Sequence, residues 1–328
     1  MIISKTPFRI SFVGGGTDID VFYKRESGAV VSAAIDKFMY VTLNKSFEDK
    51  IRVAYSRTEI VDSLDELKHE LVRESMRLCG VKNGVEITTI ADVPSRGTGL
   101  GSSSSLTVGL LNALHFFRGN RKTAKELAED ACKIEIGVVR EPIGKQDQFI
   151  AAFGGLRFIE FNSDESVKVT PIKLSGSTQR KLQENLLLFF TGQTRKASEI
   201  LSEQKKNVEL SREKFEALSR MKALAVEMRN SLQKNSVEKV GELLHENWKL
   251  KKTLASGISN EGIEKFYGTA LNAGASGGKI LGAGGGGFLL LFVPKENQEK
   301  VRGTLNLKEL KFGFESEGSR IILDERKQ

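Results

Sequence analysis

A short glycine- and serine-rich stretch, residues 94–105 (PSRGTGLGSSSS), most constrains what this chain can form. The alternating β-branched run at residues 84–90 predicts a strand before it, and the apolar spacing of residues 106–114 predicts a helix after it. The stretch therefore joins a strand to a helix N-terminus. Three glycines let the backbone turn its N–H groups inward, and the helix dipole adds partial positive charge there. We expect this loop to bind a chain of phosphates.

A flexible linker is the usual structure of a glycine- and serine-rich run. Here the run is short, starts at Pro94, which fixes the direction of entry, and is flanked closely by a strand and a helix. These features favour the phosphate loop. The stretch is not a Walker A loop, because the string G-x-x-x-x-G-K-[ST] occurs nowhere in the chain.

The length of 328 residues suits one large domain or two medium ones. No segment has the uninterrupted apolar length of a membrane helix, and the N-terminus begins a strand rather than a signal peptide. We therefore expect a soluble, cytoplasmic protein without a membrane partner. Cys79 and Cys132 lack the spacing of a disulfide framework or a zinc site, which predicts two buried thiols.

The formal charge of +8 and the pI near 9.3 raise the question of nucleic-acid binding. The basic residues alternate with acidic ones in helix-like segments such as residues 209–214, as is typical of solvated helix faces. We therefore expect no nucleic-acid partner. A modest basic excess also suits an enzyme with two anionic ligands.

Two acidic residues follow turn-like segments and have more than one interpretation. Residues 5–13 alternate as a strand that breaks at residues 14–20 (GGGTDID), where a ligand can approach the backbone with Asp18 beside it. A hairpin turn in which Asp18 caps a helix fits the same pattern. Asp147 stands among polar residues at the head of an apolar run, and it either caps a short helix or acts in a site.

A third glycine-rich stretch, residues 274–287, leads into the strand-like run 288–293. It matches G-x-G-x-x-G and G-x-S-x-G only by accident, because its flanking elements are the reverse of those that either motif requires. The three histidines lie in helix-like surroundings, which argues against a serine-hydrolase triad. The glycines either pack backbone against a substrate or the phosphate loop, or form a plain flexible turn.

Helix signals elsewhere are local. Thr123 is a suitable N-cap for a helix over residues 123–137. Residues 196–256 predict three charged amphipathic helices, with Trp248 as a core aromatic. The strand-like, polar residues 158–175 mark the expected change of domain.

The three glycine-bearing stretches, in this order, resemble those of the GHMP kinase superfamily, which includes galactokinase, homoserine kinase and mevalonate kinase. Residues 6–10 (TPFRI) and 14–18 (GGGTD) look closest to its sugar-1-kinase branch, with the heptose 7-phosphate kinases and fucokinases. The resemblance spans nearly the whole chain. It implies an α+β fold of two domains, a ribosomal-protein-S5-domain-2-like β/α domain over residues 1–165 and a ferredoxin-like α+β domain over residues 166–328. The site is then expected in the cleft between them.

The resemblance also implies roles for individual residues. Asp147 matches the catalytic aspartate and Arg9 the basic residue beside it, while Ser103 and Glu135 match the ligands of Mg²⁺. Because Ser104 and Ser105 stand where many relatives have small residues, the metal-binding serine stays open by one position. The implied nucleotide-binding set is Pro94, Gly97, Gly99, Leu100, Gly101, Ser102, Ser103 and Ser104. The implied substrate-binding set is Gly15, Gly16, Thr17, Asp18, Gly284 and Gly285, with Asp18 on sugar hydroxyls.

These roles suit phosphoryl transfer, in which an enzyme mainly positions the reactants and neutralises phosphate charge. The sequence thus predicts an ATP- and Mg²⁺-dependent kinase, monomeric or homodimeric, that converts D-glycero-D-manno-heptose 7-phosphate to its 1,7-bisphosphate at the anomeric hydroxyl. An L-fucokinase or another sugar-1-kinase is the alternative within the superfamily. A nucleic-acid-binding protein and an inactive regulator are rivals from other classes. Cationic candidates for the 7-phosphate are Arg96, Arg140 and Lys145.

Overall fold

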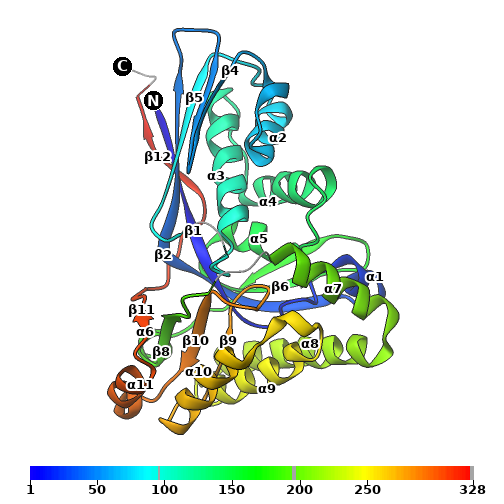
Figure 1. Cartoon of the computed structure of the whole chain (residues 1–328), viewed down its shortest axis with the longest axis vertical. Coiled ribbons are helices and arrows are strands. Elements are labelled where there is room, and N and C mark those ends of the chain that lie inside the picture. The colour runs from blue at the N-terminus through cyan, green and yellow to red at the C-terminus, as the bar shows by residue number, and fades with distance from the viewer. Residues whose placement is uncertain (95–96, 194–196, 326–328) are drawn as a thin grey trace.

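The computed structural model describes residues 1–94, 97–193 and 197–325, which form two joined α/β parts (Figure 1). The larger part is built on an eight-stranded sheet with a central path in the order β12-β1-β2-β5-β3-β4. Its strands are β1 (Ile2–Val13), β2 (Gly28–Lys45), β3 (Ile51–Ala54), β4 (Thr58–Val61), β5 (Val85–Ala91), β6 (Leu156–Phe161), β7 (Val167–Pro171) and β12 (Arg320–Asp324). All of the pairings are antiparallel except that of β3 with β5.

The long strand β2 connects the two regions of this sheet, because residues 28–33 pair with β6 and residues 39–45 pair with β5. Helices gather on one side of the sheet (Figure 1). They are α1 (Asp20–Glu26), η1 (Leu64–Glu66), α2 (Glu70–Leu78), α3 (Ser102–Phe117), α4 (Ala124–Cys132), the π-helix η2 (Lys133–Val138) and α5 (Gln146–Phe153). The predicted cap at Thr123 is confirmed, since Thr123 and Glu126 form a reciprocal capping box.

The smaller part joins a four-stranded antiparallel sheet, ordered β11-β8-β10-β9, to a layer of helices. Its strands are β8 (Leu186–Phe190), β9 (Gly277–Ile280), β10 (Phe288–Phe292) and β11 (Lys308–Glu309). Its helices are α6 (Gly176–Glu184), α7 (Ala197–Leu210), α8 (Arg212–Gln233), α9 (Val240–Lys252), η3 (Ser256–Ile258), α10 (Glu261–Asn272), η4 (Lys295–Asn297) and α11 (Gln298–Leu305). The helices α7, α8 and α9 confirm the three predicted between residues 196 and 256.

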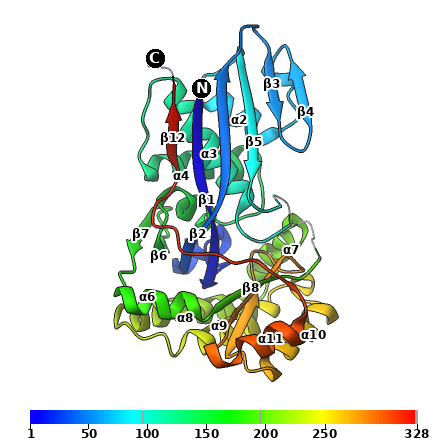
Figure 2. The same ribbon diagram turned by 90° about the vertical axis from the view of Figure 1, so that its left-hand side faces the viewer.

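The boundary expected at residue 165 falls inside the β6–β7 hairpin, because β7 pairs with β6 in the large sheet. The chain leaves this sheet only after Pro171, and it returns at its end, where β12 pairs with β1 (Figure 2). No sequence signal near residue 320 indicates a partner more than 300 positions away, so the return was missed.

Helix α3 carries the phosphate-loop candidate at its N-terminus and is anchored in the core of the larger part. Its Val108, Leu110, Leu111 and Leu114 are fully buried, and it packs against β1 and β2. The loop before it therefore has a rigid support. Cys79 is buried and Cys132 only partly so, which corrects the expectation of two buried thiols. Among the described residues, no helix combines the length and apolarity that crossing a membrane requires.

Trp248 of α9 is fully buried in the second core, beside the ring of Tyr267. Replacing it with alanine is expected to lower the free energy of unfolding by about 3–5 kcal/mol, because a large cavity remains. Urea denaturation followed by far-UV circular dichroism measures this. Phe47→Ala is the control: its ring is fully exposed, and a change within about 0.5 kcal/mol is expected. Equal effects of the two substitutions would contradict the assignment of Trp248 to the core.

Candidate active site

The main cavity, of about 910 Å³, lies between the two parts of the molecule. Its wall combines the end of β1 and the turn after it, the loop before α3, the start of α5, and residues of α7, α9 and the β9–β10 loop. It thus brings together the three glycine-bearing stretches, although they are separated by more than 70 residues in the sequence. The predicted residues that line it are Arg9, Gly15, Gly16, Asp18, Gly97, Gly99, Gly101, Ser102, Ser103, Glu135 and Asp147.

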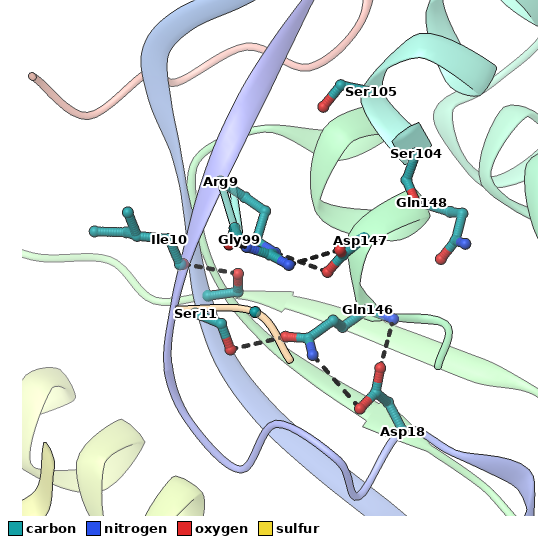
Figure 3. Close-up of polar contacts among 12 residues, drawn as sticks. Arg9, Ile10, Ser11, Asp18, Gly99, Ser104, Ser105, Gln146, Asp147 and Gln148 are labelled. Carbon is teal, nitrogen blue, oxygen red and sulfur yellow. Dashed lines mark hydrogen bonds and ion pairs between the residues drawn. The ribbon is translucent and has the colours of Figure 1, made fainter. Parts of the chain in front are cut away.

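Arg9 and Asp147 form a two-pronged ion pair at the centre of this cavity (Figure 3). Arg9 Nε donates to Asp147 Oδ1 at 2.7 Å, and Nη2 donates to Oδ2 at 2.6 Å. Such a bidentate pair fixes the carboxylate plane as well as its position. Asp147 lies in the first turn of α5, whose start has no side-chain cap. The alternative in which Asp147 caps that helix is therefore excluded.

Asp18 accepts backbone hydrogen bonds from both sides of the cavity rim. Gly16 N–H donates to Oδ1 at 2.9 Å and Gln146 N–H donates to Oδ2 at 3.1 Å. Asp18 is 3% exposed, and burial raises the pKa of its carboxyl, with these N–H donors opposing the shift. Helix α1 begins after Ile19 without a side-chain cap, so Asp18 does not cap the helix that follows it.

The loop before α3 has the left-handed backbone that its glycines permit. Gly97, Gly99 and Gly101 have φ of 67°, 77° and 75°, values that side-chain-bearing residues rarely adopt. Ser102 and Ser103 line the cavity at the helix N-terminus. Backbone N–H groups and the helix dipole at such a place can bind an anion.

Three predicted nucleotide-site residues serve the loop without lining the cavity. Leu100 is fully buried, and its carbonyl accepts from Arg9 N–H at 3.0 Å. Ser104 is buried and donates to Glu135. Pro94 is exposed at the entry of the loop. Of the candidates for the 7-phosphate, Arg96 lies outside the described residues.

Glu135 lines the same cavity as Ser103 and is surrounded by hydroxyl and amide donors. Its carboxylate accepts from Ser104 Oγ at 2.8 Å, from Thr107 Oγ1 at 3.1 Å and from Gln148 Nε2. Burial raises the pKa of Glu135 to about 7, although these donors favour the ionised form. A carboxylate and the Ser103 hydroxyl are both hard oxygen donors, so this corner of the cavity fits Mg²⁺.

The third glycine stretch meets the phosphate loop backbone to backbone. A Cβ on Gly282 would lie 2.6 Å from Gly99 Cα, and a Cβ on Gly99 would lie 2.4 Å from the Leu281 carbonyl oxygen. Any side chain there would push the two loops apart. Of the two interpretations of this stretch, packing against the phosphate loop is the one that the structure shows.

Gly284 and Gly285, which were expected in the substrate site, are not among the residues that line the cavity. A Cβ on Gly284 would meet the Ile258 carbonyl at 2.6 Å, and Gly285 N–H donates to the same oxygen at 2.8 Å. The loop lines the cavity instead through Gly282 and Ala283. Thr17 also faces away, because its hydroxyl is buried and bonded to the backbone of Ala29.

Several cavity residues carried no signal in the sequence. Gln146 links Ser11 of β1 to Asp18. Its Oε1 accepts from Ser11 Oγ at 2.8 Å, and its Nε2 lies 3.5 Å from Asp18 Oδ1. Lys251 and Lys279 line the cavity from the smaller part of the molecule. Arg140 and Lys145 line a second cavity of about 220 Å³, which shares Asp18 with the first.

A phosphate loop facing an arginine-held carboxylate defines the site of a phosphotransferase. The family model for the GHMP kinase N-terminal domain matches residues 60–155, and that for the GHMP kinase C-terminal region matches residues 228–308. A D-glycero-alpha-D-manno-heptose 7-phosphate kinase of Campylobacter jejuni is 33% identical over 89% of both chains. A galactokinase of Pyrococcus furiosus is 26% identical over 92% of this chain and 91% of its own.

Among solved structures, a D-glycero-D-manno-heptose 1-phosphate kinase from Bacteroides thetaiotaomicron superimposes with a TM-score of 0.81, at 26% identity and 99% coverage of both chains. The chain belongs to the GHMP kinase family. It is a phosphotransferase with an alcohol group as acceptor, and the family uses ATP as the phosphate donor. The expected family and the two-domain fold are confirmed.

The raised pKa of Glu135 makes its contribution to stability depend on pH. Between pH 4.5 and 7 the folded protein keeps the proton that the unfolded chain releases, so stability falls as pH rises through this window. We expect Glu135→Gln to gain up to about 3 kcal/mol relative to the wild type between pH 4.5 and pH 8. Urea denaturation in EDTA at several pH values measures this. Glu296→Gln, at an exposed position, is the control, and parallel pH profiles for Glu135→Gln and wild type would contradict the burial argument.

Proposed function

We propose that this protein is an ATP- and Mg²⁺-dependent kinase of the anomeric hydroxyl of D-glycero-D-manno-heptose 7-phosphate, with the 1,7-bisphosphate as product. The bidentate Arg9–Asp147 pair beside the phosphate loop is the observation that carries the reaction type. The similarity to the Campylobacter jejuni enzyme, over nine-tenths of each chain, supports the heptose phosphate as acceptor. The similar galactokinase supports a sugar hydroxyl as the reacting group.

In the proposed mechanism, Asp147 contacts the anomeric hydroxyl and accepts its proton as the oxygen attacks the γ-phosphorus. Arg9 holds both carboxylate oxygens in one plane, so the remaining lone pairs of Asp147 point into the cavity. An anomeric hydroxyl is more acidic than an ordinary alcohol, which lessens the demand on the base. Asp18 accepts hydrogen bonds from the other sugar hydroxyls, since its carboxylate lies on the same rim.

The phosphates of ATP are proposed to lie on the loop from Gly97 to Ser103, at the N-terminus of α3. Ser103 and Glu135 are the residues that would hold Mg²⁺, which neutralises phosphate charge when bound. We assign Ser103 rather than Ser104 to this role, because Ser104 is buried and its hydroxyl already donates to Glu135. Ser104 then orients Glu135, a second layer of support that commonly tunes metal ligands.

The acceptor is tested by measuring ATP consumption with a panel of sugars and sugar phosphates, with product position read by phosphorus NMR. Turnover restricted to the heptose 7-phosphate, with a new anomeric phosphate signal, is expected. Turnover on fucose, mannose or galactose alone would keep the reaction and replace the substrate. The absence of turnover on every sugar would overturn the proposal.

Asp147→Asn tests the proposed base. The amide keeps the shape but does not accept the proton, so kcat is expected to fall by about 10²–10⁴-fold, with the ATP dissociation constant within twofold of the wild type. Asp62→Asn, at an exposed position that does not line the cavity, is the matched control. Wild-type turnover by Asp147→Asn would exclude the carboxylate from the reaction.

A further inference from the structure

Two lysines of the smaller part line the cavity and are almost completely buried. Lys251 lies in the last turn of α9 and is 5% exposed, and Lys279 lies on β9 and is 1% exposed. Lys251 Nζ donates to the Gly282 carbonyl oxygen. Within residues 1–94, 97–193 and 197–325, the Lys279 ammonium group has neither a hydrogen-bond acceptor nor an ion-pair partner. Buried ammonium groups normally have such partners, so Lys279 is arranged for a group that comes from outside the chain.

The surroundings of the two lysines disfavour their charge until an anion arrives. Burial lowers the pKa of Lys251 to about 8, with Asp18 opposing and Arg9 adding to the shift. Burial also lowers the pKa of Lys279, and the charges of Lys251 and Arg9 lower it further. An anion bound between the two ammonium groups would offset both the cost of desolvating their charges and their mutual repulsion.

A chain of contacts places Lys251 at the reacting centre. Its acceptor Gly282 packs on Gly99 of the phosphate loop, the Gly99 carbonyl accepts from Arg9 Nη1, and Arg9 holds Asp147. The lysine therefore lies close to both the nucleotide phosphates and the acceptor hydroxyl of the proposed mechanism.

The hydrogen-bond donors of Arg9 are already engaged within the site. Its Nε and Nη2 donate to Asp147, and its Nη1 donates to the Gly99 carbonyl. A phosphoryl group between the phosphate loop and Asp147 would therefore take its positive charge from Mg²⁺ and from side chains other than Arg9. Lys251 and Lys279 are the buried cations that line the same cavity.

We propose that Lys251 and Lys279 are catalytic residues that bind the phosphoryl group while it passes from ATP to the acceptor. In that step the bond from the γ-phosphorus to the ADP oxygen breaks, and a bond to the acceptor oxygen forms. The hydroxyl proton passes to Asp147, and both lysines stay protonated. The transition state carries its charge on the three peripheral oxygens of the phosphoryl group, where two fixed ammonium groups stabilise it. The inference rests on phosphoryl transfer and not on the identity of the sugar.

Lys251→Met and Lys279→Met test this role, because methionine keeps the length and apolar packing of the side chain but removes the charge. Each is expected to lower kcat by about 10²–10³-fold with every acceptor that the wild type uses, with both KM values within threefold. Lys252→Met is the matched control, because Lys252 does not line the cavity and its ammonium pairs with Glu264 at 2.8 Å. Wild-type kcat is expected for it. The melting temperature of Lys279→Met should not fall, since that ammonium has no bond to lose and its removal relieves its desolvation.

A second measurement separates this role from structural effects. ADP with aluminium fluoride mimics the phosphoryl group in transfer, so its affinity should fall by the same factor as kcat while the affinity for ADP alone is unchanged. Unchanged kcat, or equal losses for ADP and its fluoride complex, would overturn the proposal. So would a loss confined to acceptors that already carry a phosphate, which would assign the lysines to that group instead. The acceptor panel decides the substrate independently of all these outcomes.

Discussion

The geometry of the site depends on Arg9, which ties three separate segments together from a position on β1. Its backbone N–H donates to the Leu100 carbonyl at 3.0 Å, and its side chain reaches the Gly99 carbonyl and both oxygens of Asp147. The sheet, the phosphate loop and the start of α5 thus share one residue that is 4% exposed. Without it, the loop would lose its tether and Asp147 would remain largely buried without a counter-charge, which is costly.

Contact between two glycine loops supplies the complementary constraint across the cleft. Gly99 and Gly282 approach too closely for any Cβ, and Phe288 N–H donates to the Thr98 carbonyl at 3.2 Å. The backbone of the smaller part therefore forms one wall of the phosphate site. The contact also fixes the cavity residues of α9 and β9 relative to those of the larger part, and such a frame reduces the reorganisation required when reactants bind.

The parts of the fold that sequence predicted are those decided by neighbouring residues. The strand–loop–helix around residue 100, the cap at Thr123 and the three helices between residues 196 and 256 all follow from local patterns. The return of β12 to β1 and the burial of Lys251 and Lys279 depend on packing between distant segments, and a lysine in a charged helix looks the same whether it faces water or a cavity. The sequence could not decide between the two interpretations of Asp18 for the same reason, because its partner Gln146 is 128 positions away.

Two carboxylates, those of Asp18 and Asp147, lie near the start of α5 and are held by different partners. Gly144 makes the approach possible, since a Cβ there would lie 2.0 Å from Asp18 Oδ2. Asp147 is held by the charge of Arg9, whereas Asp18 is held by the neutral N–H groups of Gly16 and Gln146. The two carboxylates are thus held by different kinds of partner, one of them charged and the other neutral. An acceptor that contacted both carboxylates, as we propose, would meet two differently supported groups along one rim, which would orient a polyol more strictly than two equivalent carboxylates.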